Sequence, residues 1–138
     1  MLLRIMLLLS LIALVGGCET LRNNNISWQL EQSTKNYNHL IRWNELDKAV
    51  LLYPPDSLRE EFRRKVQAAK GAHITDVRVK SQVCSPTKGE ATVEIEIEYY
   101  REPSVTIRTV EDVQNWRYVE EGKDNWIWRL MTLPPDFK

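Results

Sequence analysis

The sequence predicts an α+β domain in which N-terminal helices pack on a curved, four-stranded antiparallel sheet. Apolar residues recur at helical spacing through the first half of the domain, up to about residue 70. After Gly71 the spacing changes, and apolar and polar residues alternate in four successive runs, as in strands with one buried face. A short apolar segment precedes this domain at the N-terminus.

The N-terminal segment is short and apolar, and it ends in a cysteine. Arg4 precedes the eleven-residue run IMLLLSLIALV, which is shorter than the roughly 20 apolar residues that a membrane-spanning helix needs. The run leads into Val15-Gly16-Gly17-Cys18, which resembles the lipobox of bacterial lipoproteins, except that Val15 stands where leucine is favoured. The resemblance implies a signal peptide over residues 1–17 and attachment of palmitate or a related lipid to Cys18. The alternative is a buried apolar helix that ends at this cysteine.

The segment after the cysteine is interpreted as a lipidated tether, residues 18–26, which precedes a single domain over residues 27–138. Its seven residues ETLRNNN, mostly polar, reach at most about 25 Å when extended, so the domain is expected close to its membrane. The resemblance implies a place in the cell envelope, facing the periplasm. Glu19 is not the aspartate that retains many such lipoproteins at the inner membrane, which favours the outer membrane.

Three helices are predicted at the start of the domain. The first covers about residues 27–43. Asn44 is expected to cap a short second helix, which ends before Pro54-Pro55 because proline lacks an N–H and clashes with the preceding turn. Asp56 is expected to cap a third helix over residues 57–70, and Gly71 is expected to end it.

Two strands follow, joined by the turn 85–89. In the first, Val77, Val79, Ser81 and Val83 are expected to face inward; in the second, the odd-numbered residues 91–99 are expected inward and four glutamates outward. Pairing Cys84 with Glu90 places Lys80 opposite Glu94 and Arg78 opposite Glu96. A slip by one residue would bury the glutamates, so these charges specify the register.

The last two strands are predicted around Ile107 and around Trp128. Val105, Ile107 and Thr109 are expected inward, and pairing Tyr99 with Val105 sets Arg108 across from Glu96. Beyond Val110 the apolar positions change parity, which predicts a β-bulge or bend near residues 111–115. A loop around Gly122 leads to the last strand, and the tail from Leu133 is expected to be irregular.

The composition excludes several classes of function. The chain has 19 Lys+Arg and 19 Asp+Glu, and this balanced surface gives no electrostatic reason to expect nucleic acid as a partner. The sequence contains no Gly-rich phosphate loop, no His/Cys cluster with metal spacing and no GxSxG turn, so no cofactor and no metal are predicted. Cys18 is assigned to lipid, which leaves Cys84 as a lone thiol, interpreted as a strand-end residue.

The order of elements and the aromatic positions resemble the nuclear transport factor 2-like superfamily. The resemblance rests on the helical pair between Tyr37 and Tyr53, the strand entry Ile74-Thr75-Asp76-Val77, the strand at Ala91-Thr92-Val93 and the ending Trp116…Gly122…Trp126. It implies a cone-shaped domain whose sheet wraps around a helix and leaves a pocket. A cystatin-like domain, with one helix on a similar sheet, is the nearest alternative. The superfamily contains enzymes such as ketosteroid isomerase and many non-catalytic binding modules, so the fold alone does not decide the function.

No catalytic residue of that family can be placed on an identifiable position. Enzymes of this fold use pocket carboxylates, histidines and tyrosines for proton transfer. The inward face of the first two strands contains no carboxylate. The remaining acid or base candidates each have a plainer role as cap, core, surface or bulge residue; they are Tyr37, His39, Asp47, His73, Glu111 and Asp112.

The aromatic residues indicate binding. Five tryptophans is a high number for the 121 residues that follow the signal. They serve core packing, or an aromatic-lined ligand pocket or partner surface. The candidate binding residues are Trp28, Tyr37, Trp43, Trp116, Tyr118, Trp126 and Trp128. The predicted function is that of a membrane-anchored lipoprotein whose non-catalytic domain binds a protein partner or a small hydrophobic ligand. The alternatives are a small ketosteroid-isomerase-like enzyme and a structural accessory subunit of an envelope complex.

Overall fold

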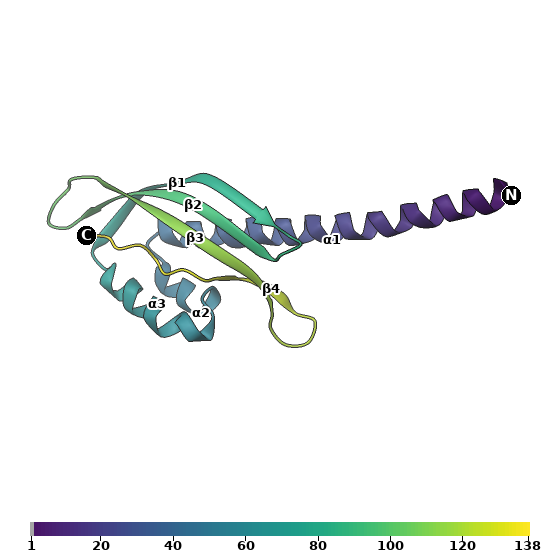
Figure 1. The fold of residues 1–138 in the computed structure, drawn as a ribbon. Coiled ribbons are helices and arrows are strands. Elements are labelled where there is room, and N and C mark those ends of the chain that lie inside the picture. The colour runs from purple at the N-terminus through teal and green to yellow at the C-terminus, as the bar shows by residue number, and fades with distance from the viewer. Residues whose placement is uncertain (1) are drawn as a thin grey trace.

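The computed structural model describes the backbone of residues 2–138 and the side chains of residues 17–138. The helices are α1 (Leu2–Arg42), α2 (Leu46–Leu52) and α3 (Asp56–Ala68), and the strands are β1 (Ala72–Ser85), β2 (Glu90–Arg101), β3 (Arg108–Glu120) and β4 (Trp126–Leu130). The strands form one antiparallel sheet in the order β1-β2-β3-β4 (Figure 1). The prediction of an α+β domain with helices before a four-stranded antiparallel sheet is confirmed. The predicted signal, residues 1–17, falls almost entirely outside the residues whose side chains are described, and it stays a prediction.

Helix α1 lies along one face of the sheet and continues beyond it on its N-terminal side (Figure 1). The expected tether, residues 18–26, is part of this helix, and the expected helix start at Ser27 is therefore wrong. The reason is that the buried stripe of the helix begins upstream of Ser27: Ile26 and Leu30 both pack in the core. The indole Nε1 of Trp128 also donates to the Ile26 carbonyl oxygen at 3.0 Å, which holds this part of α1 against β4.

The ends of the helices differ from the predicted caps. Asn44 has a left-handed backbone with φ of 55°, so it terminates α1 and does not cap α2. The Glu45 N–H donates to the Leu40 carbonyl at 2.8 Å and the Asn44 N–H to the Ile41 carbonyl at 3.1 Å, the two bonds of a Schellman motif. Asp56 is the first residue of α3, makes no capping bond and instead pairs with Arg59 at 2.5 Å.

Strand β1 has two irregularities that change which side chains face the core. Arg78 lies opposite Glu96, as predicted, but Cys84 pairs with Ala91 and Ser81 with Glu94. The predicted pairs of Cys84 with Glu90 and of Lys80 with Glu94 are wrong because the register shifts between Val79 and Ser81. That shift reverses the parity of the strand. Val83, expected inward, is accordingly exposed, and Cys84 packs against the core instead. Val79, also expected inward, lies before the shift and opposite the buried Ile95, and it is exposed on this edge strand.

Strand β3 pairs with β2 without a bulge. Its register sets Tyr99 opposite Arg108 and Glu96 opposite Glu111, so the predicted pairs of Tyr99 with Val105 and of Glu96 with Arg108 are wrong. Val105 and Ile107, expected in the core, precede β3 and are exposed. The predicted bulge near residues 111–115 is absent from the described β2–β3 pairing. The change of parity has another cause: two polar residues, Asp112 and Gln114, occupy the inward positions of a regular strand.

The centre of the core, between the helices and the sheet, is aromatic. Tyr37 of α1 meets Tyr53, Phe62 and Trp116 edge to face, with ring centroids 5.3–6.4 Å apart. Such pairs stabilise a fold by about 0.5–1.5 kcal/mol each beyond the area that they bury. The C-terminal segment has no regular structure, as expected, and it closes the far end of the core with Phe137, which packs on Tyr99 at 5.0 Å.

Candidate functional site

The structure separates the seven candidate binding residues into two groups. Tyr37, Trp116 and Trp128 are buried, and packing accounts for them. Trp28, Trp43 and Trp126 expose 58%, 63% and 47% of their surface, and Tyr118 is partly buried. Trp43 stands at the C-terminal end of α1, whereas Trp28 and Trp126 lie where α1 passes β4 and leaves the sheet.

Aromatic rings form a continuous stack at that end of the domain. Trp126 and Tyr118 are stacked at 5.6 Å with an interplanar angle of 28°, and Tyr118 and Trp128 are 5.2 Å apart. The stack is fixed to α1 because the Tyr118 hydroxyl donates to Gln29 Oε1 at 3.1 Å. The side chains in the stack are therefore positioned by two strands and one helix, with its last member, Trp126, open to solvent.

Two grooves flank this stack. The first, called the aromatic groove below, has a volume of about 570 Å³; it is lined by Arg22, Asn25, Ile26, Pro86, Thr87, Lys88, Gly89, Tyr118 and Trp126. The second, called the Trp28 groove, has a volume of about 370 Å³; it is lined by Trp28, Gln29, Gln32, Ser33, Leu52, Tyr53, Ile127 and Trp128. Both volumes fall in the range of about 300–1,000 Å³ that is usual for sites of small molecules.

The β1–β2 turn forms one wall of the aromatic groove because Gly89 lets it approach β3 closely. A Cβ at this position would meet Tyr118 Cβ at 3.3 Å, and the backbone φ of 63° is one that L side chains rarely adopt. The Tyr118 N–H donates to the Gly89 carbonyl at 2.9 Å. The turn is thus tied to the aromatic stack.

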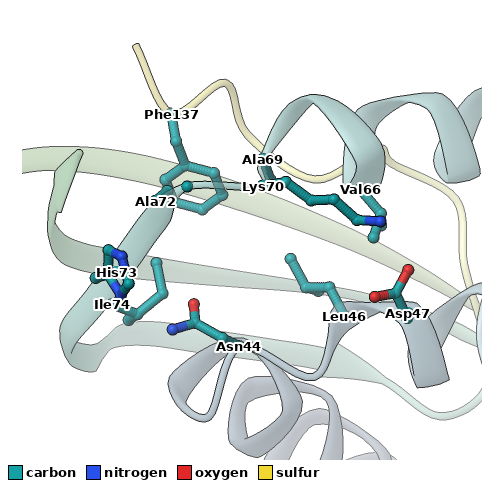
Figure 2. A pocket seen from close by; sticks show the side chains of 11 residues that line it. Asn44, Leu46, Asp47, Val66, Ala69, Lys70, Ala72, His73, Ile74 and Phe137 are labelled. Carbon is teal, nitrogen blue, oxygen red and sulfur yellow. The ribbon is translucent and has the colours of Figure 1, made fainter. Parts of the chain in front are cut away.

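A third pocket brings together two of the predicted acid or base candidates, Asp47 and His73. It has a volume of about 240 Å³ and lies between the start of α2, the end of α3 and the start of β1. Figure 2 shows Asp47 and His73 at opposite sides of this pocket, with Asn44 and Leu46 between them. His73 instead pairs with Glu102 at 3.0 Å and stacks on Tyr100 at 4.8 Å. The pocket does not join the two groups into an acid–base pair.

A polar cluster lies buried under the sheet. Asp112 is 6% exposed, and the Gln114 amide donates to Asp112 Oδ2 at 3.3 Å and to Asn38 Oδ1 at 2.8 Å. Burial raises the pKa of Asp112 to about 6, against the opposing effect of the bond from Gln114. Burial, and secondarily the charge of Asp112, raises the pKa of Tyr37 well above its usual value. The Tyr37 hydroxyl and Gln114 Oε1 have no hydrogen-bond partner among the described side chains.

The predicted role of Asp112 as a bulge residue is therefore wrong, because its side chain is buried on the inner face of β3. In a regular strand, positions 110, 112, 114, 116 and 118 share one face, and Val110 and Trp116 mark that face as the inner one. This signal was present in the sequence. The inward face of β1 and β2 has no carboxylate at the expected positions, but β3 supplies one.

Other features bear on metal and lipid chemistry. Cys18 is an exposed free thiol and Cys84 a half-buried one, whose pKa is raised by burial. Ser27 Oγ lies 3.9 Å from the Cys84 sulfur. Within the part of the chain that the structure describes, no group of three or more His, Cys, Asp or Glu side chains could hold a metal ion. In that same part, no helix has both the length and the apolar character to cross a membrane.

Comparisons with known proteins give no further assignment. No protein-family model, no curated protein and no solved structure matches this chain. The function is therefore argued from the site alone.

Proposed function

We propose that this chain is a lipid-anchored lipoprotein of the cell envelope, with a non-catalytic, nuclear transport factor 2-like domain that binds a protein partner or a small hydrophobic ligand. The binding surface is the end of the domain formed by the aromatic groove and the Trp28 groove. Trp28 and Trp126 are its exposed anchors. Lipid on Cys18 would hold this end of the domain next to the membrane, with the outer membrane favoured.

The observation that carries the proposal is the position of the exposed aromatic side chains. Tryptophan is usually buried in a monomer, and an exposed aromatic group beside a groove marks a contact surface more often than a random patch does. Trp126 lies at the open end of a stack that is already fixed by Tyr118 and by α1. A ligand there meets a preorganised surface and loses little additional conformational entropy to binding.

The unbroken helix between Cys18 and the grooves also supports the proposed binding surface. Residues 19–25 are helical, so Cys18 is one to two helical turns from Arg22 and Ile26, at about 1.5 Å per residue. A lipid on Cys18 is thereby close to both grooves. An extended tether over residues 18–26, as the sequence indicated, would by itself have left the orientation of the domain undetermined.

The test is a comparison of tryptophan substitutions in the membrane-extracted protein. Trp126→Ala and Trp28→Ala should reduce the capture of the bound partner or ligand, measured by quantitative mass spectrometry of the purified complex. Trp43→Ala is the matched control, because Trp43 is similarly exposed but follows the C-terminal end of α1 and lines neither groove. Equal losses in all three variants, or no loss in any, would contradict the assignment of the binding surface.

A second candidate function, proton transfer in a small ketosteroid-isomerase-like enzyme, is favoured by Asp112. A buried carboxyl with a pKa near 6 beside an unpartnered tyrosine hydroxyl is the type of group that enzymes use as acid or base. Binding is preferred because Asp112 lines neither of the two grooves nor the pocket between Asp47 and His73. A cellular phenotype abolished by Asp112→Asn, in a protein that still folds and reaches its membrane, would support the enzyme instead.

A further inference from the structure

Two cations at the rim of the aromatic groove have no side-chain partner within residues 17–138. Arg22 on α1 and Lys88 in the β1–β2 turn are exposed, and neither side chain makes a hydrogen bond or an ion pair with another side chain in residues 17–138. Most other cations in this region are engaged: Arg117 pairs with Glu90 at 3.5 Å and Arg129 with Glu121 at 2.5 Å. The two rim cations are therefore available to an anionic group.

No carboxylate is among the described residues that line the groove. Glu90 and Glu121 are held by the arginines just named, and Glu120 accepts a hydrogen bond from the Asp124 N–H at 3.2 Å. An arginine and a lysine that line the same groove can bind a phosphate through charge-assisted hydrogen bonds, the arginine with its fork of donors and the lysine as a point charge. The rim thus fits a phosphate better than a neutral group.

The floor of the groove has the opposite chemistry. Ile26 is buried there, and the stacked rings of Tyr118 and Trp126 also line it. Burying apolar surface against such a floor is favourable by about 25 cal/mol per Å². The groove therefore combines an apolar trough with a cationic rim, which is the complement of an anionic amphiphile.

We propose that the aromatic groove binds an anionic membrane phospholipid, one whose headgroup carries no compensating positive charge, with its phosphate at Arg22 and Lys88 and part of an acyl chain along Tyr118 and Trp126. This inference rests on the proposed function and specifies its ligand. An acyl chain attached to Cys18 is the other possible source of apolar chain, but it brings no phosphate and leaves both cations unexplained. A lipid of the surrounding membrane satisfies the rim and the floor together.

The test uses the full acylated chain reconstituted in phosphatidylcholine vesicles. A small fraction of either phosphatidic acid or phosphatidylcholine, brominated on the same acyl chain, is added as a quencher of tryptophan fluorescence. Phosphatidic acid should quench several times more efficiently than phosphatidylcholine at equal mole fraction. The difference should be reduced in Trp126→Phe, which removes the exposed fluorophore of the groove, and lost in the double variant Arg22→Ala/Lys88→Ala.

The matched control is Lys35→Ala/Arg64→Ala. This double variant removes two exposed cations that lie outside the groove and have no side-chain partner in residues 17–138. The protein should therefore keep its preference for the phosphatidic acid headgroup. Equal quenching by both lipids, or a preference that survives Arg22→Ala/Lys88→Ala, would overturn the proposal. The proposal would also be overturned if the non-acylated variant Cys18→Ser, added to the same vesicles, showed the preference and the acylated protein did not. That result would mean that the lipid attached to Cys18 occupies the groove of the acylated protein. If the headgroup preference fails while partner capture still depends on Trp126, the proposed function stands and only its ligand is wrong.

Discussion

Substitution of Asp112 by asparagine should stabilise the domain, and by an amount that depends on pH. The carboxyl is 6% exposed and its pKa is raised from 3.8 to about 6, so the folded state binds a proton more tightly than the unfolded state does. Between about pH 4 and pH 6 the native protein therefore carries more protons, and the free energy of unfolding falls as the pH rises. A pKa that is higher by about two in the folded state corresponds to about 3 kcal/mol of stability at low pH, and this contribution is fully lost above about pH 6.

Asparagine resembles the protonated carboxyl and cannot ionise. At pH 8, Asp112→Asn should thus raise the free energy of unfolding by about 2–3 kcal/mol, while at pH 4 the two proteins should differ by less than about 1 kcal/mol. Urea unfolding followed by tryptophan fluorescence at several pH values measures this difference. Glu111→Gln is the matched control, because Glu111 is the adjacent, exposed carboxyl of the same strand. A difference between Asp112→Asn and the parent that does not change with pH would refute the argument that burial perturbs this group.

Three other measurements check the sheet, the groove and the anchor. Ile95→Ala should lower the free energy of unfolding by about 2–4 kcal/mol through a core cavity, while Glu96→Gln should lower it by well under 1 kcal/mol; equal losses would contradict the register of β2. Gly89→Ala should cost about 1–2 kcal/mol, seen as a lower urea midpoint, because the φ of 63° and the contact with Tyr118 both oppose a Cβ; an unchanged midpoint would mean that the turn moves freely. Mass spectrometry of the mature N-terminus should find lipid on Cys18; an unmodified cysteine, or cleavage elsewhere, would remove the basis of the envelope location.

The pairing of Arg78 with Glu96 shows how a correct contact can come from an incorrect register. The sequence placed these residues opposite each other by counting back from Cys84 and Glu90, and the structure pairs Cys84 with Ala91 instead. The register shift between Val79 and Ser81 offsets this one-residue difference at the turn, so Arg78 still lies opposite Glu96 and the ion pair forms. Lys80 adds a second contact to Glu96 at 3.6 Å. Charge alternation indicated the faces of the strands, but it could not locate an irregularity within an exposed edge strand.

The sequence by itself determined the number, type and order of the elements and the inward face of β2. Those features follow from hydrophobic periodicity and from turn residues, which are local. Only the tertiary structure decided the rest. Three features depend on segments that are far apart in the chain, such as α1, the β1–β2 turn and β4. They are the point on α1 where the core begins, the burial of Asp112 and the aromatic groove. Trp126 is exposed and Trp116 is buried. The difference depends on whether another element of the fold packs over the side chain, and the local sequence pattern does not contain that information.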